Sequence, residues 1–171
     1  MQAMAIQRRQ ILFLVRFAVL SIIFYIPITI PALSRVTVEP FTRGLTSVSA
    51  AVLNMLGQHV QTAGTIIRGG GFGVDIKNGC NAVEAVAFLA AAVLAFEAPL
   101  KLRIVGAIAG SIILEVLNVI RIVTLYLLGR YHRNLFDMFH LAVWQSVMFG
   151  AAVLIFLIWT SRATRHAVAN R

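Results

Sequence analysis

The only cysteine of this chain, Cys80, is the side chain best suited to act as a nucleophile. It follows two glycine-containing breaks, at residues 68–73 and 78–79, and precedes an unbroken, alanine-rich apolar stretch over residues 82–96. Because glycine permits tight backbone bends, we expect a helix to begin just after the cysteine. The unpaired N–H groups and the dipole of a helix N-terminus favour a thiolate over a thiol. The alternative interpretation is that Cys80 is a small hydrophobic side chain.

An arginine inside an apolar stretch, Arg121, is the second candidate. The stretch ends near Gly129, which places Arg121 on the order of 12 Å of helix rise from the outer edge of a membrane. An arginine at this depth is costly unless it is paired, and this favours a role in catalysis or substrate binding. The alternative is a structural ion pair with Glu115 or Glu84.

The third candidate, His140, stands at the outer start of the last apolar stretch, at the same expected depth as Cys80. A histidine at a membrane boundary can also be a simple interfacial side chain. Together, however, Cys80, His140 and Arg121 predict acyl-transfer chemistry. The thiolate attacks a peptide carbonyl, the histidine transfers protons and the arginine stabilises the oxyanion.

Three polar residues are expected to support this site. Glu84 follows Cys80 by four residues and therefore shares its helix face, where it either holds a catalytic group or forms a buried ion pair. Glu115 and Asn118 precede Arg121 at steps of three residues, which leaves all three on one broad helix face. Asn118 and Glu84 are expected to orient the catalytic side chains.

Zinc binding is a competing interpretation, since Cys80, His140 and Glu84 are all residue types that bind zinc. The sequence lacks an HExxH motif and the paired cysteines of a recognisable zinc site. Arg121 beside a cation would also be repelled. We therefore expect no metal and no cofactor.

The composition predicts an integral membrane protein, because 60% of the residues are hydrophobic and only 12% are charged. A membrane-spanning helix needs about 20 mostly apolar residues. The net charge is +9, but no aromatic residues are interleaved with the basic residues, as they would be on a nucleic-acid-binding surface. Membrane topology therefore explains the basic residues better than a nucleic-acid partner does. We expect an all-α membrane protein, a single integral domain over residues 1–171, with four spans near 11–33, 82–98, 104–128 and 140–160.

The basic residues suggest how the chain is oriented. Arg8 and Arg9 precede the first apolar run, as in a signal anchor with a cytoplasmic N-terminus. Arg162, Arg165 and Arg171 follow the last run. We therefore expect a multi-pass protein of the cell (inner or cytoplasmic) membrane with both termini in the cytoplasm and the active site on the extracytoplasmic side.

Residues 34–79 form the only long segment between spans and are expected outside the membrane. Apolar residues recur there at steps of three and four, which predicts an amphipathic helix lying on the bilayer. Further along, residues 60–67 and 72–76 flank the glycine run and could pair as a short hairpin. A second, shorter outer loop is expected over residues 129–139. The amphipathic pattern consists of Phe41, Leu45, Val48, Val52, Met55 and Leu56.

The order of a cysteine at the start of one span, an Asn-x-x-Arg on the next and a histidine at the start of the last resembles the exosortase/archaeosortase family of membrane-embedded cysteine transpeptidases. The resemblance covers roughly residues 79–162 and rests on Cys80, Asn118, Arg121 and His140. It implies a Cys/Arg/His catalytic set that cuts a C-terminal sorting signal, made of a short motif, a transmembrane helix and a basic tail, from exported proteins. The new C-terminus would pass to an acceptor nucleophile whose identity the sequence leaves open.

The single span before the outer segment is similar to that of the short exosortases, and the type-H group paired with IPTLxxWG-type signals is the nearest match. The partners implied are the sorting-signal helix of the substrate and the lipid bilayer. A different class of function is a non-catalytic assembly subunit or a small transporter whose intramembrane charges fix helix packing. A transporter would more readily show internal repeats and a polar path at the midplane.

Overall fold

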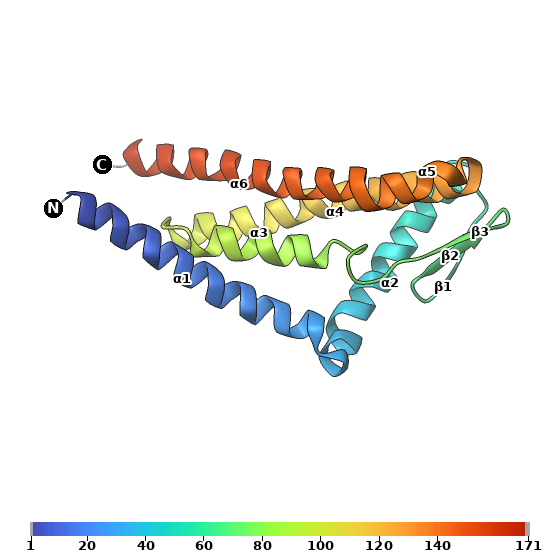
Figure 1. The fold of residues 1–171 in the computed structure, drawn as a ribbon, viewed down its shortest axis with the longest axis horizontal. Helices are drawn as coiled ribbons and strands as arrows, with labels where there is room; N and C mark the ends of the chain where they lie inside the picture. The colour runs from blue at the N-terminus through green and yellow to red at the C-terminus, as the bar shows by residue number, and fades with distance from the viewer. Residues whose placement is uncertain (1, 170–171) are drawn as a thin grey trace.

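The computed structural model describes the backbone of residues 2–169 and the side chains of residues 7–165, so Arg171 of the basic tail lies outside the described residues. Long helices dominate the structure, and a small sheet stands at one end (Figure 1). The helices are α1 (Gln2–Thr29), α2 (Pro31–Met55), α3 (Val83–Ala95), α4 (Leu100–Tyr131), α5 (Arg133–Met138), the π-helical turn η1 (Phe139–Val143) and α6 (Trp144–Ala169).

The structure confirms the predicted all-α membrane protein. In the part of the chain that the structure describes, three helices are long and apolar enough to cross a bilayer, over Gln7–Thr29, Leu100–Tyr131 and Arg133–Arg165. The second predicted span is shorter than expected, because α3 has 13 residues and rises only about 20 Å against a hydrocarbon core of about 30 Å. It begins one residue after the predicted start and ends three residues before the predicted end, because Phe96 is extended and Pro99 follows. Figure 1 shows that α3 begins short of the sheet end of α4 and α6.

The amphipathic helix predicted in the outer segment begins earlier than its apolar pattern does. Only Ile30 separates α1 from α2, and Pro31 occupies the first turn of α2, where proline has no hydrogen bond to lose. α1 and α2 therefore meet at a sharp corner (Figure 1). The face of α2 that turns inward carries Val38, Thr42, Leu45, Thr46, Ser49, Ala50 and Leu53.

The predicted hairpin is instead a three-stranded antiparallel sheet, β1 (Gln61–Ala63), β2 (Ile66–Gly69) and β3 (Phe72–Asp75). The pairing of β2 with β3 confirms part of the prediction. The single strand predicted over residues 60–67 is wrong, because Gly64 adopts a φ of +64° and the chain reverses there. Gly70 and Gly71 form the second turn with φ of +56° and +78°, the left-handed pair that a type I′ hairpin requires.

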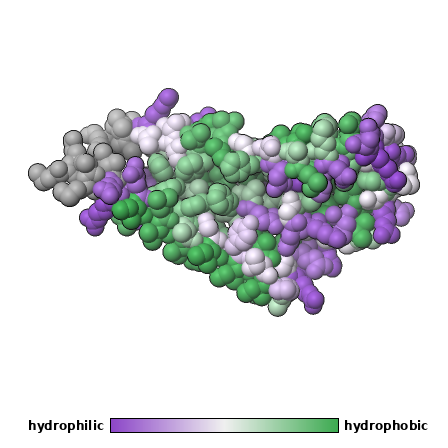
Figure 2. All heavy atoms as spheres, in the orientation of Figure 1, coloured by the Kyte–Doolittle hydropathy of each residue, from purple (hydrophilic) through white to green (hydrophobic). Residues whose placement is uncertain are grey.

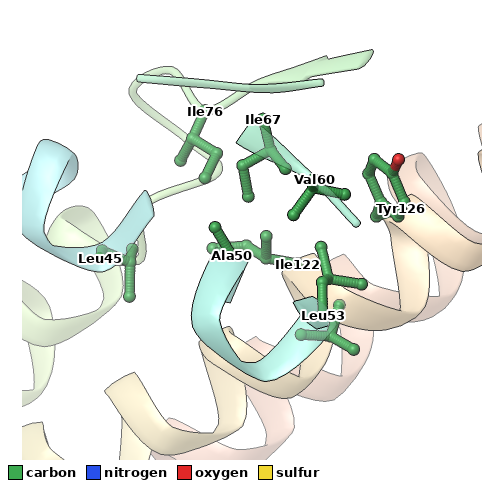
Figure 3. Packing of buried hydrophobic residues seen from close by; sticks show 9 residues of the cluster. Leu45, Ala50, Leu53, Val60, Ile67, Ile76, Ile122 and Tyr126 are labelled. Atoms are coloured by element: carbon green, nitrogen blue, oxygen red, sulfur yellow. The ribbon is translucent and has the colours of Figure 1, made fainter. Parts of the chain in front are cut away.

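A hydrophobic cluster attaches this sheet to α2 and to the outer half of α4 (Figure 3). Tyr126 of α4 is fully buried, and its hydroxyl donates a hydrogen bond to the carbonyl oxygen of Gly69 at 2.6 Å. The sheet is therefore held at a fixed place against α4. The cluster comprises Leu45, Ala50, Leu53, Val60, Ile67, Ile76, Ile122, Val123 and Tyr126.

The remaining helices form a bundle in which α3 packs against α4 and α6. The two chain ends lie at the same end of the molecule, and α1 and α6 diverge from there toward the sheet (Figure 1). Figure 2 shows hydrophobic residues over the half nearer the termini and hydrophilic residues gathered over the half that carries the sheet.

The outer loop predicted over residues 129–139 is almost absent. α4 continues to Tyr131, only His132 departs from helical geometry, and α5 begins at the next residue. The stretch after His132 contains no glycine or proline, so nothing ends the helix before the last span. The last span therefore begins upstream of His140, and this residue lies within a helix rather than at its start.

Candidate active site

Cys80 lies on a tight turn that precedes α3. Gly79 has a φ of +84°, and Ala82, the residue before α3, has the left-handed φ of +57° that side chains rarely adopt. The N–H of Cys80 donates to the carbonyl oxygen of Lys77 at 2.9 Å, so this donor is already paired. The helix begins three residues after the cysteine, at Val83, and Cys80 is not part of its first turn.

A buried amide that sequence reasoning missed, Asn81, fixes this turn. Its side chain is fully buried, and Nδ2 donates to the hydroxyl of Thr42 on α2 at 2.9 Å. Its Oδ1 accepts the N–H of Val83 at 3.3 Å. The only signal in the sequence was an asparagine beside the candidate nucleophile, and nothing there indicated Thr42 as its partner, 39 residues away.

The structure brings Cys80 and His140 together from positions 60 residues apart, with Sγ 3.1 Å from Nε2. His140 lies in η1, where one wider turn interrupts the helical hydrogen bonding between α5 and α6. Such turns re-aim side chains and are frequent at functional sites. The ring of Phe136, one turn earlier, lies 5.5 Å from the imidazole, centroid to centroid. The histidine therefore faces the thiol with an aromatic ring beside it.

Arg121 is buried, with 3% of its surface exposed, and its Nη1 donates to the carbonyl oxygen of Gly79 at 3.3 Å. The N–H of the same glycine donates to Oε1 of Glu84 at 2.9 Å. Gly79, the residue immediately before Cys80, thus links the Glu84 carboxylate to the Arg121 guanidinium through its peptide groups. Within the described residues, the polar contact of Arg121 is with this backbone carbonyl and not with the carboxylate of Glu84 or Glu115, and its Nε has no partner.

One cavity of about 310 Å³ contains all three candidate catalytic residues, Cys80, Arg121 and His140. Its walls come from β3, from the outer part of α4 and from α5. They are mostly apolar, so a charge that develops inside is poorly solvated and interacts strongly with Arg121. The other lining residues are Phe72, Gly73, Val74, Asp75, Ile76, Ile122, Leu125 and Phe136.

The electrostatic environment corrects the expectation of a thiolate. Burial raises the pKa of the Cys80 thiol above its ordinary value; nearby Arg121 lowers the pKa, but by less than burial raises it, and Glu84 raises it further. The free thiol therefore keeps its proton at neutral pH. A thiol in this state needs a base within reach to become a nucleophile, and the structure places the imidazole of His140 within hydrogen-bonding distance of it.

The expected supporting residues lie in three different places. Glu84 lines a second cavity of about 310 Å³, which it shares with Arg121. Asn118 is fully buried, and neither atom of its amide has a partner among the described residues. Glu115 lies in a separate groove of about 580 Å³ between α2, α3 and α4, where both of its buried carboxylate oxygens lack a partner in the described part of the chain.

A comparison with protein families identifies the chain. The family model described as transmembrane exosortase matches residues 3–159, which is most of the chain. The chain belongs to the transmembrane exosortase family. No curated protein and no solved structure gives a match.

Membership of the exosortase family agrees with a membrane-embedded protein and with the resemblance first indicated by the order of Cys80, Arg121 and His140. The match reaches from α1 into α6 and so includes every helix that contributes to the cavity. Across residues 7–165 of this exosortase, no group of three or more histidine, cysteine, aspartate or glutamate side chains could hold a metal ion.

Proposed function

We propose that this exosortase is a cysteine peptidase and transpeptidase that cleaves a C-terminal sorting signal at the extracytoplasmic face of the membrane. The observation that carries the proposal is the 3.1 Å contact between Cys80 Sγ and His140 Nε2 in a cavity that also contains Arg121. A nucleophile and a base at this distance, with a cation beside them, fit the requirements of acyl transfer.

The first step forms a bond between Cys80 Sγ and the carbonyl carbon of the scissile peptide. The thiol proton passes to His140 Nε2 as the bond forms, because the thiol itself is protonated at neutral pH. The carbonyl oxygen becomes an oxyanion, and Arg121, which lines the cavity, stabilises it through its guanidinium donors. Gly79 holds the other side of the guanidinium, so Arg121 is oriented before the substrate binds.

The second step breaks the carbon–nitrogen bond. The imidazolium of His140 returns its proton to the leaving amine, and the acyl group remains on Cys80 as a thioester. A nucleophile of the acceptor, or water, then gives up a proton to the imidazole and attacks the thioester carbon. The thioester bond breaks and Cys80 regains a proton, which completes a transfer or a hydrolysis.

Glu84 acts in this scheme as a positioning residue. It accepts the N–H of Gly79, whose carbonyl oxygen accepts a hydrogen bond from Arg121. Loss of the carboxylate would free the peptide that sets both the arginine and the turn of Cys80. Asn118 lies one helical turn below Arg121 and is proposed to steady it by packing.

The orientation proposed for the chain places both termini in the cytoplasm of the cell. Arg8 and Arg9 lie near the start of α1, and Arg162 and Arg165 lie near the end of α6. These helix ends lie opposite the sheet (Figure 1), in agreement with the positive-inside rule. The cavity then faces the extracytoplasmic side. The substrate is proposed to be an exported protein whose signal has a short motif, a membrane helix and a basic tail, and an IPTLxxWG-type motif is the first to test.

The test is processing of a reporter that carries such a signal, co-expressed with the unmodified chain, with Cys80→Ala or with Cys80→Ser. We expect the reporter to be shortened only by the unmodified chain, while all three accumulate equally in the membrane. Ser47→Ala is a suitable control, because Ser47 is exposed on α2 and its hydroxyl donates to the carbonyl oxygen of Arg43 in the same helix. Processing that persists in both cysteine variants would instead assign the chain to the alternative class of non-catalytic assembly subunits.

A further inference from the structure

A second cavity lies on the other side of Arg121 from the thiol, and the catalytic scheme above leaves it unused. It measures about 310 Å³ and is lined by residues of α1, α3, α4 and α6 together with Gly79. Arg121 lines both cavities, so the guanidinium forms part of the wall between them. The lining residues are Tyr25, Gly79, Ala82, Glu84, Ala85, Arg121, Gln145 and Met148.

The second cavity differs from the first in its chemistry. A phenol, a carboxylate, an amide and a guanidinium line it, through Tyr25, Glu84, Gln145 and Arg121. Tyr25 and Gln145 are both exposed, although each lies within a helix long and apolar enough to cross the membrane. Tyr25 lies four residues from the end of its span, where a phenol meets the membrane boundary, whereas Gln145 lies twelve residues inside its own span, where an exposed amide is costly in lipid unless it is paired.

The position of this cavity explains why polar groups are needed there. α1 and α6 diverge toward the sheet (Figure 1). The residues that line the cavity come from both of these helices and from the start of α3. Figure 2 shows that the hydrophilic surface on this face reaches inward from the sheet to the middle of the molecule. A membrane segment that approaches Arg121 between α1 and α6 therefore meets hydrogen-bonding groups before it reaches the thiol.

A peptide bond must leave helical geometry before a thiol can attack it. If that bond lies at the top of a membrane helix, the first residues after it expose backbone N–H and C=O groups at the membrane boundary. Lipid cannot satisfy these groups, and each one left unpaired costs several kcal/mol. The protein must therefore provide donors and acceptors on the membrane side of the catalytic arginine.

We infer that the cavity lined by Tyr25, Glu84 and Gln145 binds the unwound first turn of the substrate's membrane helix, on the leaving-group side of the scissile bond. The inference rests on the proposed function, and it assigns an orientation to the substrate chain in the two cavities. The chain before the scissile bond occupies the apolar cavity under the sheet, and the chain after it descends between α1 and α6. Gln145 and Tyr25 pair the freed backbone groups, while Glu84, which already accepts from Gly79, can accept a further N–H.

The test is site-specific photo-crosslinking in intact membranes. A benzoylphenylalanine replaces Tyr25 or Gln145 in the Cys80→Ala background, so that the reporter with its sorting signal stays uncut. Val147 is the matched control, because it lies two residues from Gln145 on the same helix, is exposed and points to a different face. Val116 tests the separate groove around Glu115.

We expect crosslinks from positions 25 and 145 to the first residues of the reporter's membrane helix, and none from positions 147 and 116. A crosslink from 116 without one from 145 would place the helix in the groove and overturn the inference. So would a complete absence of crosslinks to a reporter that the unmodified chain processes. An absence of processing by the unmodified chain contradicts the proposed function instead, so the two failures are distinguishable.

A second readout does not depend on the crosslinker. Gln145→Leu is expected to raise KM for the reporter about tenfold, and Gln145→Asn, which keeps both the donor and the acceptor, is expected to restore most of this loss. The rescue separates hydrogen bonding from simple packing at the position. Equal KM values for the leucine and asparagine variants would contradict a binding role for the amide.

Discussion

Cys80 Sγ and His140 Nε2 lie 3.1 Å apart although 60 residues separate them in the chain. Cys80 lies on a tight turn that depends on the positive φ of Gly79, and His140 lies in the π-helical turn that interrupts the last helix. The contact therefore depends on an irregular backbone on both sides. Four expectations follow from this pair and its surroundings.

The first concerns the base. His140→Ala is expected to lower the rate of signal cleavage by about 10²–10⁴-fold, because a protonated thiol then has no neighbouring acceptor. His132→Ala is the control, since His132 lies at the break between α4 and α5 and is exposed. Quantitative blotting of the shortened reporter measures both. A cleavage rate that the His140 variant shares with the unmodified chain would remove the imidazole from the mechanism.

The second concerns pH. Because burial raises the pKa of Cys80, the thiolate fraction at neutral pH is small and grows about tenfold per pH unit until the pKa is passed. Alkylation by iodoacetamide should therefore keep accelerating above pH 8.5, where an ordinary thiol begins to level off. Arg121→Gln should slow alkylation at pH 8 and Glu84→Gln should speed it, because the arginine lowers this pKa and the carboxylate raises it. Mass spectrometry of the modified peptide gives the rates, and a plateau reached below pH 8 would show a lowered pKa instead.

The third expectation concerns the fixed geometry of the donor groups on the Arg121 guanidinium. Arg121→Lys keeps the charge but cannot donate to Gly79 and to an oxyanion at the same time in a fixed geometry. We expect kcat to fall by about 10²–10³-fold, as when an oxyanion donor is removed. Turnover with reporter in excess checks this. Near-normal kcat in the lysine variant would show that charge alone is sufficient.

The fourth concerns the sheet that covers the cavity. A Cβ added at Gly129 would lie 2.0 Å from Phe72, whose ring forms part of the cavity wall. Gly129→Ala should therefore displace β3 and lower cleavage clearly while the chain still inserts into the membrane. Gly150→Ala is the matched control, because no atom of the described residues lies within 4 Å of its Cβ position. Equal loss in both variants would point to a general effect of the substitution on the helices.

The sequence was informative where one kind of interaction dominates. Long apolar runs predicted the membrane helices because burial of backbone groups in lipid leaves few alternatives. Cys80, Arg121 and His140 could be chosen because a charged or reactive side chain at the edge of such a run is costly unless it is used. The structure places all three around one cavity.

The sequence was less informative where several weak preferences compete. The apolar run that predicted a span over residues 82–98 starts within one residue of α3, but the helix ends at Ala95, because Phe96 is extended and Pro99 follows. The start of α2 at Pro31 depends on a corner with α1 that no apolar pattern marks. The position of Cys80 at a helix N-terminus predicted a thiolate, whereas the pKa depends chiefly on burial by elements distant in sequence.

The π-helical turn Phe139–Val143 carries one residue more than an α-helical turn would. Removal of a single residue from this segment would let α5 and α6 join as one regular helix, which would span the membrane as well as before. The imidazole of His140 would then rotate by about 100° around the helix axis and leave the thiol. One inserted residue thus decides whether this membrane helix presents His140 to the thiol, and the proposed activity is expected to depend on the length of this segment as well as on its residue types.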